Sequence, residues 1–117
     1  MKNFRNLKVW QKGFEIAKST YNLTKKFPTE EKFGLISQMN RASISITSNI
    51  AEGSSRRSEK DYFRFLEIAL GSCFEIESQL IISIELGFVE NEQENSLLQN
   101  IDEEQKMLIS FMKKLNN

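Results

Sequence analysis

The sequence predicts an all-α protein: a single-domain, antiparallel up-down-up-down four-helix bundle over residues 1–117. Three observations support this prediction. Apolar residues recur at the three- and four-residue spacing of an amphipathic helix in four separate stretches. No stretch shows the two-residue alternation of a half-buried strand. The breaks between the stretches are only a few residues long, so sequence neighbours must run antiparallel.

The first helix is expected from about Leu7 to Lys26, with apolar residues along one face. The only proline, Pro28, ends it because proline cannot donate a backbone hydrogen bond. The second helix is expected from about Glu30 to Ser54, with Gly53 in the left-handed conformation that commonly ends helices.

The second helix carries two apolar stripes. The first is a core face, made of Leu35, Met39, Ala42, Ile46 and Ile50. The second is made of Phe33, Ile44 and Ala51. A surface helix that serves one core needs only one stripe, so the second stripe predicts a contact with another copy of the chain. A central helix with neighbours on both sides inside one subunit explains the pattern equally well.

The third helix, from about Glu59 to Leu86, is apolar over more than half of its circumference and is therefore expected to be the most buried. Ser58 with Asp61 resembles a capping box at its start. Gly87 and Phe88 predict a Schellman motif at its end. A last helix from about Asn91 has the apolar stripe Leu97 or Leu98, Ile101, Leu108, Met112 and Leu115.

Charge is balanced overall but uneven along the chain. Sixteen basic and sixteen acidic residues cancel, whereas residues 1–32 carry +5, residues 33–64 carry +2 and residues 65–117 carry −7. A basic first half is compatible with steering between subunits or with a local patch for RNA. Solvated helix faces that differ in sign explain it as well, and global neutrality argues against strong non-specific binding to nucleic acid.

The residue types present point away from catalysis. The chain has no histidine, which excludes Ser-His triads, the usual general base and the commonest metal ligand. We find no cofactor or metal motif and expect a protein that is not an enzyme; a hydrolase with a carboxylate metal site is the remaining alternative. The single cysteine, Cys73, and the lack of a signal peptide or membrane-spanning run predict a cytoplasmic location without membrane contact.

Two polar groups are candidate sites. Glu77 falls on the apolar face of the third helix, where an unpaired charge is costly. We expect Arg41, on the polar line of the second helix, to pair with Glu77, and Ser45 and Asn49 to donate further hydrogen bonds. Glu52, on the same line, is the remaining member of this expected network. This network serves either helix register or a ligand, and the structural role has the greater weight.

The second candidate site is the basic cluster at the turn between the second and third helices. It consists of Arg56, Arg57, Lys60 and Arg64. Such a cluster can contact phosphates, so it is the candidate nucleic-acid site. A solvated turn is the alternative, and it has the greater weight.

Several motifs together resemble one bacterial family, the four-helix-bundle proteins encoded by intervening sequences within large-subunit ribosomal RNA genes. The most specific is the run from Ser48 to Gly53, Ser-Asn-Ile-Ala-Glu-Gly, preceded by Ser45-Ile46. The others are Leu7-Lys8-Val9-Trp10-Gln11, Phe27-Pro28 followed by Glu31, Gly34-Leu35 with Gln38, Gly71-Ser72 with Glu75, and Leu86-Gly87.

The resemblance implies a ring-like homopentamer without enzymatic activity. It also implies kinship with the accessory variability protein of diversity-generating retroelements, which partners a reverse transcriptase and its RNA. The expected function is therefore a homo-oligomeric scaffold or adaptor that binds RNA or an RNA-handling protein such as a reverse transcriptase. The alternative is a purely structural protein-protein interaction module.

Overall fold

The computed structural model describes residues 3–115, without the side chains of residues 91–94. Within this part of the chain all regular structure is helical, which confirms the predicted all-α class. The helices are listed in chain order as α1 (Lys8–Thr24), α2 (Leu35–Ser54), α3 (Glu59–Glu85) and α4 (Asn91–Lys113), with short 3₁₀ helices η1 (Phe4–Asn6) before α1 and η2 (Thr29–Glu31) before α2.

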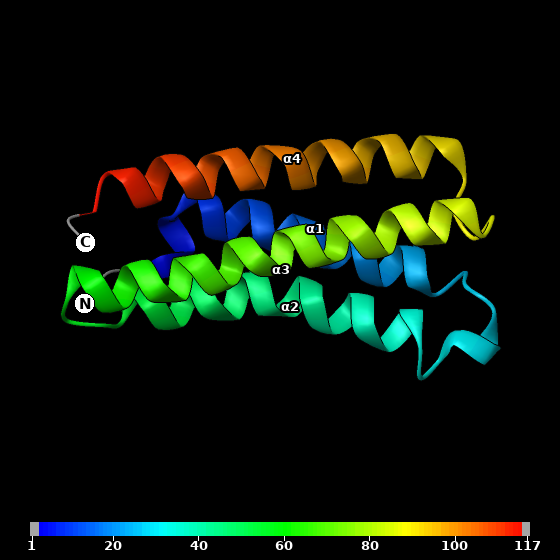
Figure 1. Cartoon of the computed structure of the whole chain (residues 1–117), viewed down its shortest axis with the longest axis horizontal. Coiled ribbons are helices and arrows are strands. Elements are labelled where there is room, and N and C mark those ends of the chain that lie inside the picture. Colours follow the sequence, from blue (N-terminus) through cyan, green and yellow to red (C-terminus); the bar gives the residue numbers. More distant parts are fainter. Residues whose placement is uncertain (1–2, 116–117) are drawn as a thin grey trace.

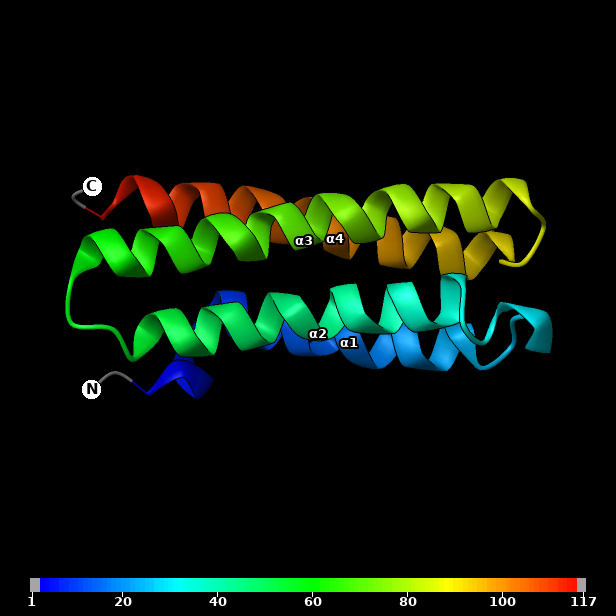
Figure 2. The same cartoon turned by 60° about the horizontal axis from the view of Figure 1, so that its bottom comes forward.

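The helices form one compact domain of 43 × 24 × 21 Å (Figure 1). Helices α1 and α3 each pack against α2 and α4 but not against each other, so they lie on opposite sides of the bundle. Figure 2 shows α1 beside α2 and α3 beside α4. The connection from α2 to α3 lies at the same end of the molecule as both chain termini, and the other two connections lie at the opposite end (Figure 1).

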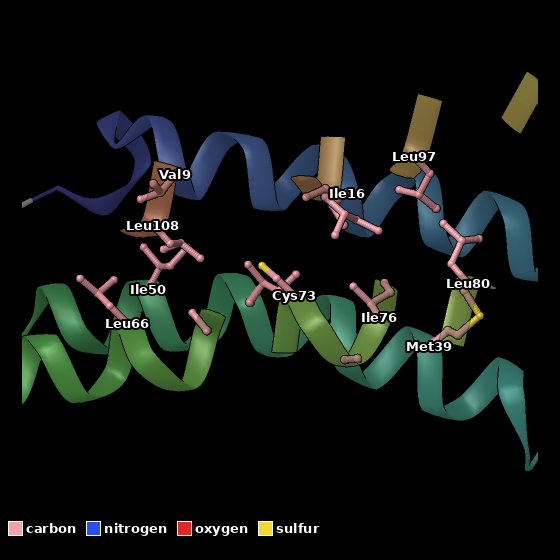
Figure 3. Packing of buried hydrophobic residues seen from close by; sticks show 14 of the residues in the cluster. Val9, Ile16, Met39, Ile50, Leu66, Cys73, Ile76, Leu80, Leu97 and Leu108 are labelled. Carbon is pink, nitrogen blue, oxygen red and sulfur yellow. The ribbon is translucent and has the colours of Figure 1, made fainter. Parts of the chain in front are cut away.

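The core runs along the whole axis of the bundle and takes side chains from all four helices (Figure 3). The stripe of α2 predicted to face the core does so at Met39, Ala42, Ile46 and Ile50, which are fully buried. The α4 stripe is buried at Leu97, Ile101, Leu108, Met112 and Leu115. The periodicity of the sequence therefore located the core correctly.

Of the two capping motifs predicted for α3, the described residues form the Ser58 half of the capping box and the complete Schellman motif. The Ser58 hydroxyl oxygen accepts a hydrogen bond from the Asp61 backbone N–H at 3.1 Å. At the other end, Gly87 has φ +79°, and the backbone N–H groups of Phe88 and Gly87 donate to the carbonyls of Ser83 and Ile84. These two bonds define a Schellman motif. Phe88 then packs against Phe27, with ring centroids 5.5 Å apart.

The start of the second helix was predicted wrongly. The chain forms η2 and a turn where the helix was expected to begin, and α2 starts at Leu35 because the backbone at Gly34 is not helical (φ −107°, ψ −114°). The Glu31 carboxylate accepts a hydrogen bond of 3.2 Å from the Leu35 N–H, which has no partner within the new helix. Phe33 lies in the turn and is 87% exposed, so it does not share a helix face with Ile44 and Ala51.

Gly53 was also misinterpreted. It is helical and lies within α2, and Gly87 is the only described residue at which a positive φ occurs. A β-carbon at Gly53 would lie 2.8 Å from Phe65 Cβ and 2.9 Å from Tyr62 Cδ1. The glycine is therefore required by the close approach of α2 and α3, not by the end of the helix.

Candidate functional site

The basic cluster predicted from the sequence borders a hollow at the turn between α2 and α3. The hollow has a volume of about 440 Å³ and is lined by Ser54, Ser55, Arg56, Arg57, Ser58, Glu59 and Tyr62. The chain leaves α2 at Ser54, and the Ser58 cap starts α3. The turn is therefore a short segment held at both ends.

The four basic side chains of this cluster differ in their surroundings. The Arg56 guanidinium lies over the ring of Phe65, 4.7 Å from its centroid, and 3.7 Å from the Glu52 carboxylate. Arg57, Lys60 and Arg64 are exposed and form no ion pair within residues 3–115. These three side chains are the ones able to contact an anionic partner without first breaking an ion pair.

The fold adds further basic residues to this end of the molecule. Lys8 begins α1, and Lys113 and Lys114 end α4, at the end that holds the α2–α3 turn (Figure 1). The opposite end carries acidic and basic residues together, namely Lys25, Lys26, Glu30, Glu31, Lys32, Glu85 and Glu90. Glu52, Glu59 and Asp61 also lie at the end with the α2–α3 turn, but basic residues outnumber acidic ones there, so net positive charge is concentrated at that end of the bundle. The sequence shows it only as scattered residues, because the helix directions decide which of them meet.

Arg41 pairs with a different glutamate from the one predicted. It forms an ion pair with Glu75 and donates a hydrogen bond to the Gln38 side chain at 3.2 Å. Glu77 instead accepts a hydrogen bond of 2.7 Å from the side-chain amide of Gln105 on α4. The predicted partner was wrong because Glu75 and Glu77 lie two residues apart and point to different sides of α3.

The remaining members of the polar line do not form a single network. Asn49 donates to the Ser45 hydroxyl at 3.0 Å, and Ser72 on α3 donates to the same hydroxyl at 2.8 Å. Glu52 is occupied by Arg56. The line therefore contacts α3 at two separate points, the Ser45–Ser72 hydrogen bond and the Arg41–Glu75 ion pair, whereas the pair of Glu52 with Arg56 stays at the end of α2.

Among the described residues, the most buried acidic or basic side chain is that of Glu104, which was not identified from the sequence. It is fully buried, and neither carboxylate oxygen has a hydrogen-bond partner among the described residues. Burial raises the pKa of Glu104 to about 8, although the nearby Lys12 ammonium acts in the opposite direction. The interruption of the α4 stripe between Ile101 and Leu108 was the available signal, because a regular stripe requires a core residue at position 104 or 105.

Cys73 lies in the same part of the core and is a free, fully buried thiol. Burial, followed by the negative charges of Glu104 and Glu77, raises its pKa well above the ordinary range for a thiol. The thiolate required of a nucleophile or a metal ligand is therefore strongly disfavoured.

The predicted interface stripe is reduced to two residues. Ile44 is exposed and borders a groove of about 340 Å³ between α1 and α2, which Phe14, Ala17, Lys18, Tyr21, Asn22 and Thr47 also line. Ala51 is half-buried on the same helix. The aromatic rings of Phe14 and Tyr21, which are also exposed, enlarge this apolar surface on the α1 side.

Within the described residues, no group of three or more Cys, Asp or Glu side chains is placed to hold a metal ion. No described helix is both long enough and apolar enough to span a bilayer.

A sequence model described as "23S rRNA-intervening sequence protein" matches residues 5–110. The chain is also similar to a crystal structure of a protein with unknown function from the S23 ribosomal protein family of Bacteroides thetaiotaomicron. That similarity has 34% sequence identity and a TM-score of 0.83, and it covers 91% of this chain and 99% of the other. A search among curated proteins gave no match.

Proposed function

The chain belongs to the 23S rRNA-intervening sequence protein family, and from this premise we propose that it is a non-enzymatic, oligomeric adaptor whose basic end binds RNA. The concentration of positive charge at one end of the bundle carries this proposal. Arg57, Lys60 and Arg64 are exposed beside the ends of α1 and α4, which add Lys8 and the lysine pair at 113–114. Lysine and arginine side chains gathered in this way bind phosphates without regard to sequence.

The proposed partner is RNA or a protein already bound to RNA, and the proposed location is the cytoplasm. The resemblance to the accessory variability protein of diversity-generating retroelements makes a reverse transcriptase with its RNA one candidate. A neutral chain attracts RNA only through a local patch, so the proposal requires weak, salt-sensitive binding at one end of the molecule.

Assembly into a ring, with pentamer as the expected size, is the second part of the proposal. It is supported by two exposed apolar surfaces on different sides of the up-down-up-down bundle. One is the α1–α2 groove with Phe14 and Ile44; the other is the outer face of α3 with Phe74 and Ile81. Contact between two different surfaces is heterologous, and such contacts close into rings when the rotation between subunits permits it.

The RNA proposal is tested by fluorescence anisotropy with a labelled stem-loop RNA at low and moderate salt. Replacement of Arg56 and Arg57 by alanine is expected to weaken binding about tenfold at low salt and to reduce its salt dependence. Replacement of Lys25 and Lys26, an adjacent basic pair at the other end, by alanine is the matched control and should leave RNA binding nearly unchanged. Absence of binding at low salt, or equal effects of the two double variants, refutes the RNA proposal.

The ring is tested by native mass spectrometry. A pentamer that dissociates on Ile44→Glu and on Ile81→Glu supports it, and both positions are exposed, so the subunit should still fold. A monomeric wild-type protein refutes the ring and favours the α1–α2 groove as a surface for a different partner.

A further inference from the structure

A second apolar groove, separate from the α2–α3 turn and from the α1–α2 groove, lies between the start of α1 and the end of α4. Its volume is about 420 Å³. Leu7 and Val9 line it on the α1 side, and Met107 and Phe111 line it on the α4 side. Lys8, Lys106 and Lys114 complete its lining, and all three are exposed. The groove is therefore apolar in its floor and positively charged at its rim.

The α4 wall of this groove has the geometry that accepts a side chain from another helix. Met107, Ser110, Phe111 and Lys114 occupy positions i, i+3, i+4 and i+7. Four residues at this spacing form the hole of knobs-into-holes packing. Ser110 is the smallest of the four and is exposed, so it leaves room at the centre. The flexible Met107 side chain lets the hole adapt to the shape of the incoming residue.

The lysines define the charge and spacing of the occupant. Lys106 and Lys114 are eight residues apart, about 12 Å along α4, and Lys8 faces them from α1. Lys8 and Lys114 form no ion pair within residues 3–115, and Lys106 has only an exposed pair with Asp102 at 3.0 Å. Such a pair contributes little and exchanges readily for another carboxylate. Acidic residues seven or eight positions apart on a helix match this rim.

We propose that this groove docks an acidic amphipathic helix of another protein. The helix inserts one apolar side chain into the α4 hole, and acidic residues on either side of it pair with the rim lysines. Amphipathic helices in apolar grooves are recognised in this way, through apolar anchors about one turn apart.

The acidic helix of a second copy fits this rim less well. On α3, Glu75 is held by Arg41 and Glu77 by Gln105, and the other acidic residues of this helix are Glu59, Asp61, Glu67 and Glu85. Glu59 and Glu67 are eight positions apart, the spacing of Lys106 and Lys114, but no residue between them is an exposed apolar one that could enter the α4 hole. The occupant is therefore sought outside this chain.

The probe is a fluorescein-labelled 18-residue helical peptide with leucines at i, i+4 and i+7 and glutamates flanking them, and a scrambled peptide of the same composition is its control. Ser110→Phe fills the hole and is expected to weaken binding at least tenfold. Ser96→Phe, at an exposed serine near the other end of α4, is the matched control and should bind as the wild type does. Circular dichroism checks that both variants are folded.

A charge exchange tests the rim. The double variant Lys8→Glu with Lys114→Glu should no longer bind the glutamate peptide and should bind a peptide in which lysines replace the glutamates. The double variant Lys25→Glu with Lys26→Glu changes the net charge equally and should alter neither binding. Binding no better than that of the scrambled peptide, or an unchanged Kd in Ser110→Phe, overturns the proposal. If Ser110→Phe lowers the native mass, the groove belongs to a second copy, and the proposal is overturned. Binding to anionic lipid vesicles through Lys8 and Lys114, without binding to the peptide, also overturns the proposal. Lys8 and Lys114 also belong to the end proposed to bind RNA, so Ser110→Phe, which changes no charge, separates the two proposals: it should lose the peptide and keep RNA binding.

Discussion

Glu104 and Gly13 lie opposite each other across the contact between α4 and α1, and a β-carbon at Gly13 would lie 3.1 Å from Glu104 Oε2. The same β-carbon would lie 3.1 Å from the Ile46 and Thr47 methyl groups on α2. A glycine in α1 therefore provides the space in which a carboxyl group is enclosed between helices. Because neither carboxylate oxygen has a hydrogen-bond partner among the described residues, the charged form is the costly one.

The buried carboxyl predicts a loss of stability at alkaline pH. The pKa of Glu104 is about 8 in the folded protein, against an ordinary value of 4.5. Between these values the folded chain keeps a proton that the unfolded chain releases, so the free energy of unfolding falls as pH rises from about 4.5 to about 8. Glu104→Gln removes this titration and should be more stable than wild type by roughly 2–4 kcal/mol at pH 8.5, with little difference near pH 4.5.

Urea unfolding at several pH values measures this difference. Glu103→Gln is the control, because the hydrogen bond from Lys12 lowers the pKa of Glu103 and its stabilising effect is lost at acid pH instead. Parallel pH profiles for wild type and Glu104→Gln would contradict the assignment of the alkaline loss to Glu104.

The close approach of α2 and α3 predicts opposite effects of two glycine substitutions. Gly53→Ala places a methyl group 2.8 Å from Phe65 Cβ and should lower the free energy of unfolding by about 1–3 kcal/mol. The methyl group of Gly71→Ala would lie on an exposed helical surface with no atom within 4 Å. This substitution should raise the free energy of unfolding by up to about 1 kcal/mol. Chemical denaturation of both variants tests the pair, and equal signs would argue against the packing described here.

The cap of α3 predicts a cost for losing one hydroxyl group. Ser58→Ala removes the acceptor of the Asp61 N–H and should destabilise the protein by about 1 kcal/mol. Ser78→Ala changes the same residue type at an exposed position inside α3 and should have a much smaller effect. Thermal unfolding followed by circular dichroism compares them. An equal shift in Tm for both variants would mean that the cap contributes nothing.

The environment of Cys73 predicts a protected thiol. The side chain is fully buried and its pKa is raised, so it should not react with an aromatic disulfide reagent at pH 7.5 until the protein unfolds. One thiol per chain should then appear in denaturant. Rapid reaction of the folded protein would show that this part of the core opens readily.

Local features of the chain were predictable because they depend on residues close in sequence. The stripe on α4 placed Ile101 and Leu108 in the core, and the turn after α3 followed from Gly87 and Phe88. The start of α2 was less predictable, since the Glu31 carboxylate and the backbone at Gly34 together break a segment whose periodicity continues through Phe33.

The candidate sites required the tertiary structure. Arg41 meets Glu75 instead of Glu77 because the rotation of α3 about its axis decides which carboxylate faces α2. Glu104 is an ordinary acidic residue in the sequence, and its side chain is buried in the fold because Gly13 leaves space for it.

The sequence by itself determined four amphipathic helices, their order, the ends of α3 and the apolar residues of the core, because hydrophobic periodicity and capping are local and energetically strong. Only the tertiary structure decided that basic residues from three separate segments meet at one end of the bundle (Figure 1). It also decided that a lysine-rimmed groove lies between the first and last helices. Polar side chains carry little periodic signal, and their neighbours are set by how rigid helices pack against one another.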